Sequence, residues 1–251
     1  MVTPSPSGSG ASGGPTHIPG GGTPQLRGYL ARPQGAGPWP GVVVLHEVLG
    51  LNDDVRRATD RFAAAGYLAL APDLLSGADR PGTGTVRCLV AVVRALKQGE
   101  GPAVADVLAA RDWLAGSDDC TGAVGVAGFC LGGGFALLLA ARGFDASAPC
   151  YGPLPDDLER VLTGACPVVA SYGGRDPALR GAARRLEEVL TGLGVEHDVR
   201  EYPRAGHAFL SDHTRGALSV LQRVPGLGHH APSAADAWAR ILAFFDLHLR
   251  R

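Results

Sequence analysis

The sequence predicts an α/β fold in which a mostly parallel central sheet carries helices on both faces. Short apolar runs rich in β-branched residues alternate along the chain with stretches of helical periodicity, and this alternation is typical of parallel sheets. Hydrophobic residues make up 45% of the 251 residues and charged residues 19%, so the chain has enough apolar material for a core. The elements form a single series, which indicates one domain over residues 25–251.

Each expected strand is a short apolar run, and each expected helix has apolar residues spaced three or four apart. The first helix is expected between Asn52, a suitable N-cap, and Gly66, and Pro72 ends the strand that follows. The strands are expected at 41–46, 67–71, 123–129, 146–151, 167–172 and 196–202. The other helices are expected at 102–115, 132–141, 178–193 and 233–249.

Glycine and proline are unusually abundant, with 37 and 19 residues, and part of this excess lies at the start of the chain. Residues 1–24 contain seven glycines and five prolines and show neither the strand nor the helix period. We therefore expect residues 1–24 to form a flexible tail. The segments 76–100 and 210–232 also lack a clear pattern, and they are the regions expected to shape a pocket.

Charge and composition exclude several classes of partner. The net charge is −1, so there is no basic field that would hold nucleic acid or an anionic membrane surface. No apolar run is long enough to span a membrane, and the first residues do not resemble a signal peptide. The expected partner is a small molecule, and the expected state is a monomer or small homo-oligomer.

The five cysteines are odd in number and include no Cys-x-x-Cys pair, so no disulfide framework is expected and the cytoplasm is the expected compartment. Cys130 aside, they are interpreted as structural thiols, although Cys150 lies at the end region of an expected strand and is a candidate for a place near the pocket. His229 and His230 have no Cys or carboxylate at ligand spacing, and no phosphate-binding motif occurs. No metal and no cofactor are expected.

The strongest local motif is Gly128-Phe129-Cys130-Leu131-Gly132, which joins an apolar strand to a helix. This is the nucleophile-elbow pattern of α/β-hydrolases, with cysteine in place of serine. Glycines on both sides allow a tight turn, and the helix N-terminus lowers a thiol pKa and offers the Leu131 N–H to an oxyanion. The alternative is a buried structural cysteine in a glycine-rich turn.

Two further residues follow in the order that α/β-hydrolases use, which is nucleophile, acid, histidine. Asp176 comes just after one expected strand, and His207 lies in the loop after the last one. The carboxyl ends of parallel strands share one edge of the sheet, where such folds place their sites. We expect His207 to take the thiol proton and later to activate water, and Asp176 to fix the imidazole tautomer.

The sequence resembles the dienelactone hydrolase (carboxymethylenebutenolidase) family, an α/β-hydrolase family. The resemblance implies an α/β-hydrolase fold, a Cys-Asp-His triad, and hydrolysis of a small ester or lactone through a thioester. The stretches that carry it lie at 46–51, 66–74, 128–133, 173–176 and 206–209, and they span most of residues 25–250.

The resemblance also assigns residues beyond the triad. It implies that Glu47 interacts with the resting Cys130 and helps to ionise it when substrate binds, and that the Val48 N–H is the second oxyanion donor. The alternative for Glu47 is a solvent-facing loop acid. Dienelactone hydrolase binds a substrate carboxylate through two arginines; Arg80 lies near one of these places, and Ser211 occupies the other. The arginine pair is therefore incomplete.

Alternative functions remain at this point, and within the enzyme class one is another thioester chemistry at the cysteine, such as acyl transfer. The chain is either a cysteine hydrolase of small esters and lactones, or a non-catalytic or redox-sensing member whose elbow thiol binds or is oxidised without turnover. The presence of both Asp176 and His207 favours the hydrolase, because a sensor requires neither of them.

Overall fold

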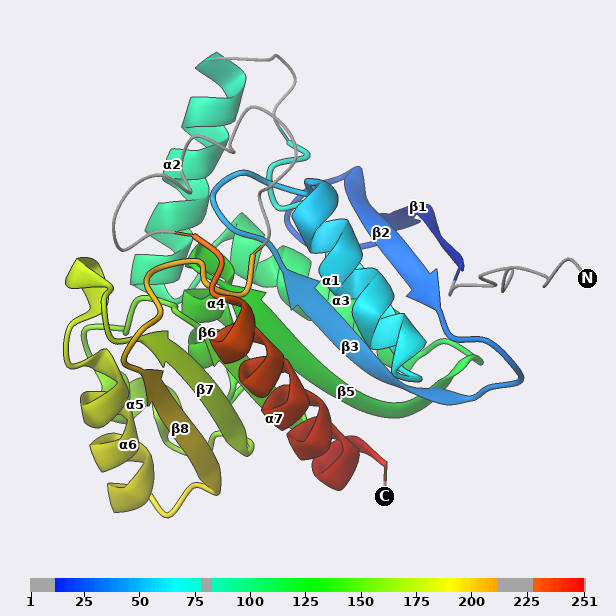
Figure 1. The fold of residues 1–251 in the computed structure, drawn as a ribbon. Coiled ribbons are helices and arrows are strands. Elements are labelled where there is room, and N and C mark those ends of the chain that lie inside the picture. Colours follow the sequence, from blue (N-terminus) through cyan, green and yellow to red (C-terminus); the bar gives the residue numbers. More distant parts are fainter. Residues whose placement is uncertain (1–11, 78–82, 212–227, 251) are drawn as a thin grey trace, which may run out of the picture.

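The computed structural model describes residues 12–77, 83–211 and 228–250, and its centre is a twisted eight-stranded sheet (Figure 1). The strand order is β1-β2-β4-β3-β5-β6-β7-β8. From β4 to β8 neighbouring strands are parallel, whereas β1 and β2 run antiparallel at one edge, so the expected mostly parallel sheet is confirmed. The strands are Ser12–Ile18, Leu26–Arg32, Trp39–Leu45, Leu68–Pro72, Cys120–Phe129, Ala146–Cys150, Val168–Gly173 and His197–Tyr202.

Helices cover both faces of this sheet. In the described residues, α1 and α7 lie on one face, and α2 to α6 lie on the other (Figure 1). Their bounds are α1 Asp53–Ala64, α2 Thr83–Gln98, α3 Pro102–Ala115, α4 Leu131–Leu139, α5 Leu158–Leu162, α6 Ala182–Gly192 and α7 Ala231–Leu249, with a 3₁₀ turn at Pro177–Leu179. All the expected helices are present, although 178–193 is divided between the 3₁₀ turn and α6.

Aromatic packing joins α1 to α7. The Phe62 ring lies 5.2 Å from Trp238 and 5.9 Å from Phe245, centroid to centroid, in a core that also contains Val42 and Val44 of β3. Edge-to-face and offset aromatic pairs stabilise a core beyond the area that they bury. As expected, Asn52 caps α1, where its side chain accepts the backbone N–H groups of the first turn. These contacts fix the start of α1 beside the carboxyl edge of the sheet.

The expectation of a flexible tail over residues 1–24 is wrong for its second half, and residues 1–11 lie outside the described part of the chain. Ser12–Ile18 forms β1, which pairs with β2 over its whole length. Glycine and proline are tolerated there because β1 is an edge strand, where a missing N–H or side chain costs little. β1 pairs with β2, a strand that the sequence did not predict either. The glycine and proline content of residues 12–18 therefore pointed wrongly to a flexible segment.

A buried carboxylate fixes the chain just after β1. Asp106 of α3 is 1% exposed, and it accepts the backbone N–H groups of Gly22 and Thr23 at 2.7 and 2.8 Å and the Thr23 hydroxyl at 2.7 Å. Hydrogen bonds to a charged acceptor are about twice as strong as neutral ones. Asp106 therefore holds the N-terminal hairpin against α3.

Replacing Asp106 with alanine is expected to lower the free energy of unfolding by about 2–3 kcal/mol, because three donors lose a buried charged acceptor. Urea denaturation followed by circular dichroism measures this change. Asp112→Ala is the control, since Asp112 lies on the same helix with its side chain 64% exposed, and its effect should stay within about 0.5 kcal/mol. Equal losses in the two variants would contradict this role for Asp106.

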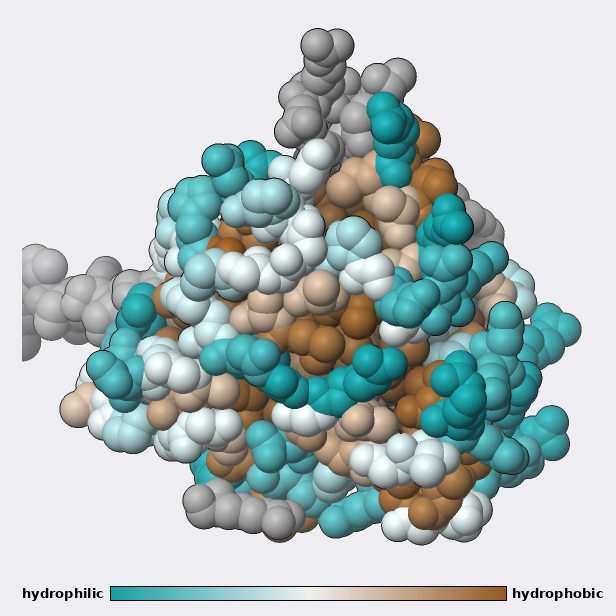
Figure 2. Space-filling model, turned by 180° about the vertical axis from the view of Figure 1, so that it is seen from behind, coloured by the Kyte–Doolittle hydropathy of each residue, from teal (hydrophilic) through white to brown (hydrophobic). Residues whose placement is uncertain are grey.

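Helix α2 lies in a segment for which the sequence predicted no element. Its inner side contributes Val92 and Ala95 to the core, while Val86 and Val90 are each 62% exposed. Seen from behind, the surface mixes hydrophilic and hydrophobic residues, and hydrophobic groups are visible beside the upper edge where α2 stands (Figure 2). In the described part of the chain, none of the helices combines the length and the apolar character needed to cross a membrane.

Candidate active site

The elbow between β5 and α4 has the geometry that its sequence predicts. Cys130 lies between them with φ 52° and ψ −115°, a backbone conformation that residues other than glycine rarely adopt. A Cβ on Gly128 would lie only 2.0 Å from the Gly132 carbonyl oxygen, so these two backbones approach as closely as glycine allows. The Cys130 N–H donates to the Cys150 carbonyl at 3.0 Å. The strand end and the helix start thus hold the thiol in one position.

Two backbone N–H groups act on the Cys130 thiol. Those of Leu131 and Val48 each lower the thiol pKa. Burial, followed by the nearby carboxylate of Glu47, outweighs them and raises the pKa of Cys130 to about 11. The structure therefore brings together the two donors named as oxyanion partners, around a thiol that is protonated at neutral pH.

His207 and Asp176 come together from the ends of β8 and β7. Nδ1 of His207 lies 2.6 Å from Oδ2 of Asp176, and Asp176 is only 3% exposed. The other carboxylate oxygen of Asp176 accepts the Ala178 N–H at 3.0 Å, and the Gly228 N–H donates to the His207 carbonyl at 2.9 Å. The carboxylate is thus placed to accept the Nδ1 proton, which leaves Nε2 of the neutral imidazole as a base.

Glu47 is not the solvent-facing loop acid of the alternative interpretation, because it is only 7% exposed. Its Oε1 accepts the Ser211 hydroxyl at 2.7 Å and the Tyr151 hydroxyl at 3.4 Å, and these two hydroxyl oxygens are 2.9 Å apart. The Tyr151 ring also meets the His207 ring edge to face, with centroids 5.2 Å apart. Tyr151 therefore contacts His207, Ser211 and the carboxylate of Glu47.

His46, directly before Glu47, fixes the backbone of this loop. Its Nδ1 lies 2.6 Å from the Glu47 carbonyl oxygen, and its Nε2 lies 3.0 Å from the Leu74 nitrogen. Since the Leu74 N–H donates, Nε2 accepts and Nδ1 carries the proton. Burial lowers the pKa of His46 below its ordinary value of 6.5, so this imidazole is neutral at pH 7.

Three of these residues had no role in the sequence interpretation. His46 appeared only inside a matching stretch, Tyr151 only as the last residue of an expected strand, and Ser211 only as a residue in place of an arginine. Their common signal is position, since each lies at or just beyond the carboxyl end of a strand or near the expected histidine. Their contacts join segments up to 164 residues apart, which no spacing in the sequence reveals.

Two candidates from the sequence remain, Arg80 and Cys150. Arg80 lies outside the described residues. Cys150 is fully buried beneath the elbow, where burial raises its pKa to about 12 and its carbonyl supports Cys130. All five cysteines are free. Within residues 12–77, 83–211 and 228–250, no cluster of three His, Cys, Asp or Glu side chains is arranged to hold a metal ion.

Replacing Glu47 with glutamine is expected to speed alkylation of Cys130 by iodoacetamide about tenfold at pH 8. Removing the neighbouring negative charge lowers the thiol pKa, so more thiolate is present at a given pH. Peptide mass spectrometry measures the rate at Cys130 itself. Glu188→Gln on the exposed side of α6 is the control and should leave the rate unchanged. An unchanged rate in Glu47→Gln would show that its charge does not reach the sulfur.

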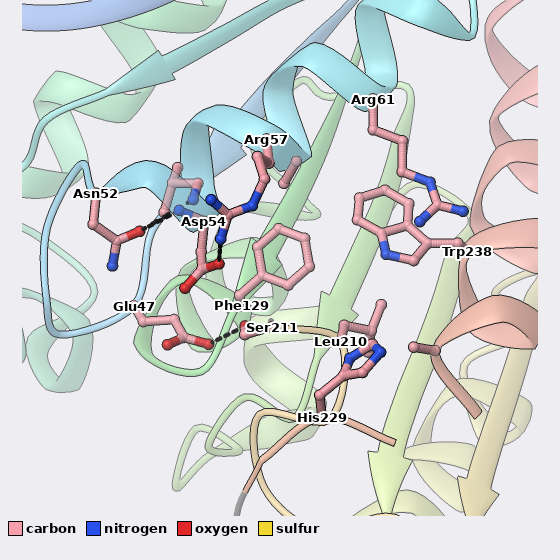
Figure 3. A pocket seen from close by; sticks show the side chains of 13 residues that line it. Glu47, Asn52, Asp54, Arg57, Arg61, Phe129, Leu210, Ser211, His229 and Trp238 are labelled. Atoms are coloured by element: carbon pink, nitrogen blue, oxygen red, sulfur yellow. Dashed lines mark hydrogen bonds and ion pairs between the residues drawn. The ribbon is translucent and has the colours of Figure 1, made fainter. Parts of the chain in front are cut away.

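A hollow of about 260 Å³ opens beside Glu47, between α1 and α7 (Figure 3). Glu47 and Ser211 line one end, and Arg61 and Trp238 line the other. Phe129, the residue before Cys130, forms part of the wall between them. The hollow therefore adjoins the elbow, although it is small for a ligand site, which commonly measures about 300–1,000 Å³.

The sequence profile of the dienelactone hydrolase family matches residues 26–249, almost the whole chain. The chain belongs to the dienelactone hydrolase family. The expected α/β-hydrolase fold and the expected class of enzyme, a hydrolase acting on carboxylic ester bonds, are confirmed by this membership together with the named relatives. The chain is 28% identical over 249 residues to a candidate carboxymethylenebutenolidase of Yersinia pestis, covering 94% of this chain and 88% of the relative.

Solved structures of family members superpose on this chain. A candidate dienelactone hydrolase from Klebsiella pneumoniae subsp. pneumoniae matches with a TM-score of 0.76 and 26% identity, over 94% of this chain and 98% of the other. A dienelactone hydrolase-like promiscuous phosphotriesterase from metagenomic libraries matches with a TM-score of 0.74 and 25% identity, over 94% and 99%. The fold therefore agrees with that of the family over nearly its full length.

Proposed function

We propose that this dienelactone hydrolase family member cleaves small esters or lactones through a thioester on Cys130, with His207 and Asp176 completing a triad. One arrangement carries the proposal: the thiol follows β5 beside two backbone N–H groups that lower its pKa, and the paired Asp176 and His207 follow β7 and β8, at the same carboxyl edge of the parallel sheet. Family membership supports the same activity.

The acylation step follows from these positions. His207 Nε2 takes the Cys130 proton, the thiolate attacks the carbonyl carbon, and the resulting oxyanion accepts hydrogen bonds from the Leu131 and Val48 N–H groups. When the tetrahedral intermediate collapses, the C–O bond of the ester breaks and the leaving alkoxide takes the proton from His207. The acyl group remains on the sulfur as a thioester, and Asp176 stabilises the imidazolium while it exists.

Hydrolysis of the thioester reverses the roles. His207 removes a proton from water, the hydroxide attacks the thioester carbonyl, and the same two N–H groups donate hydrogen bonds to the second oxyanion. The C–S bond then breaks, and the proton held by His207 returns to the sulfur. The free enzyme is restored with the carboxylic acid released.

The raised pKa of the resting thiol favours this function over oxidant sensing. Sensor cysteines have a low pKa and are exposed, whereas the pKa of Cys130 is raised to about 11 and the residue is only partly exposed. The Glu47 carboxylate contributes to that rise. We propose that Glu47 keeps the thiol protonated at rest and that His207 ionises it when an ester is bound.

Turnover of p-nitrophenyl acetate tests the proposal. Wild-type protein should release p-nitrophenol at pH 7–8 and carry an acetyl group on Cys130 when quenched during turnover and examined by mass spectrometry. Cys130→Ala should show neither, whereas Cys88→Ala, which removes another partly exposed thiol, should behave as wild type. Folded wild-type protein without turnover or acylation would overturn the proposal, and peroxide oxidation of Cys130 in such a protein would favour the sensor.

A further inference from the structure

The hollow beside the candidate active site is electrically asymmetric. At one end the Glu47 carboxylate is held by Ser211 and Tyr151. At the other end the Arg61 guanidinium lies over the Trp238 ring, 4.5 Å from its centroid. Figure 3 shows these two ends separated by the Phe129 and Leu210 side chains, which form the apolar middle. A molecule inside the hollow would therefore meet a carboxylate, which also acts on Cys130, at one end and a cation at the other.

The two arginines of this wall differ in their partners. Arg57 forms an ion pair with Asp54 on the same helix. Arg61, one helical turn further, contacts Trp238, and among the described residues no carboxylate forms an ion pair with it. The guanidinium is thus oriented by an aromatic face, while its charge is left available to a ligand.

We propose that Arg61 and Trp238 form the subsite for an anionic group carried by the substrate's small aromatic or alkyl body. The substrate class is then an ester whose reacting carbonyl lies toward Cys130 and whose carboxylate, or comparable anion, lies at the far end of the hollow. The hydrolysis of such an ester rests on the proposed function. The binding of the anion at Arg61 does not depend on it.

Physical chemistry favours this orientation over the reverse. An anion placed at the Glu47 end would be repelled by that carboxylate, whereas at the Arg61 end it gains a charge-assisted hydrogen bond. The apolar middle, formed by Phe129 and Leu210, suits one flat ring or a short alkyl chain. In this proposal Arg61 of α1 binds the anion, and an arginine at position 80 or 211 is not needed for it.

A matched pair of esters tests the subsite. 4-Acetoxybenzoate and 4-acetoxybenzamide carry the same acetyl ester and have nearly the same size, but only the first is charged. The kcat/KM for 4-acetoxybenzoate divided by that for 4-acetoxybenzamide should fall about tenfold in Arg61→Met. This variant keeps an apolar side chain over Trp238 but removes the charge. Arg61→Lys should recover most of the ratio. Arg56→Met is the control, since Arg56 lies on the same helix but does not line the hollow, and its ratio should equal that of wild type.

A binding measurement separates this inference from the proposed reaction. Calorimetry with 4-hydroxybenzoate and Cys130→Ala requires no turnover, and adding Arg61→Met should raise the Kd at least tenfold. If p-nitrophenyl acetate is hydrolysed but neither the ratio nor the Kd depends on Arg61, the subsite is refuted and the hydrolase stands. If no ester is hydrolysed but the Kd depends on Arg61, the reaction is refuted and the subsite stands.

Discussion

Replacing His207 with alanine should lower kcat/KM for p-nitrophenyl acetate by about 10⁴-fold, the size of loss seen when a triad base is removed. His207 is paired with the buried carboxylate of Asp176, and the thiol pKa of about 11 leaves almost no thiolate at pH 7.5 without a base. Steady-state absorbance assays measure the loss. The thiol itself should still react slowly with iodoacetamide, because His207→Ala leaves the elbow intact.

Two companion variants make this result specific. Asp176→Asn should cost about 10³–10⁴-fold, since the amide cannot stabilise the imidazolium and favours the wrong tautomer. His17→Ala, which removes an exposed histidine on β1, should keep wild-type activity. If His207→Ala retained a tenth of the activity or more, His207 would not be the general base.

Replacing Gly128 with alanine should destabilise the protein by more than about 4 kcal/mol, the range reached only by severe clashes or buried defects. The new Cβ would lie 2.0 Å from the Gly132 oxygen, 2.3 Å from its carbonyl carbon and 2.8 Å from the Gly133 nitrogen. All three are backbone atoms of the turn into α4, so no side chain can move aside. Denaturant unfolding, or the yield of soluble protein if the variant does not fold, measures the effect.

Gly192→Ala is the matched control for this substitution. Gly192 is the last residue of α6, and a Cβ there would meet nothing within 4 Å. Alanine has the higher helix propensity, so stability should stay equal or rise by up to about 1 kcal/mol. A wild-type unfolding midpoint for Gly128→Ala would show that the two backbones are less tightly packed than the structure indicates.

The elbow could be predicted from the sequence because its constraints are local. Gly128 and Gly132 must flank Cys130 within five residues, and an apolar strand must precede them. The same holds for Asp176 and His207, each of which follows a strand that its apolar residues reveal. The edge strand β1 was missed for the opposite reason, because its stability comes from pairing with β2 and from Asp106, which binds Gly22 just after the strand from 84 residues further along the chain.

The surroundings of Glu47 and of the hollow were also beyond sequence reasoning. Ser211 and Tyr151 reach Glu47 from two different loops, and Arg61 meets Trp238 across two helices that are distant in the chain. None of these residue types signals a function alone, since arginine on a helix and tryptophan in a core are ordinary. Only the folded arrangement shows which of them face the same space.

The neutral His46 places an acid limit on the loop that carries Glu47. In the unfolded chain this imidazole takes up a proton near pH 6.5, whereas in the folded protein burial lowers its pKa, against the opposing pull of Asp73 and Glu47. The unfolded state then binds more protons below pH 6.5, and stability falls as the solution becomes more acidic. Protonation of the folded protein would also remove the acceptor of the Leu74 N–H. Acid inactivation should therefore begin in this loop, and a preparation kept above pH 7 should hold its activity longest.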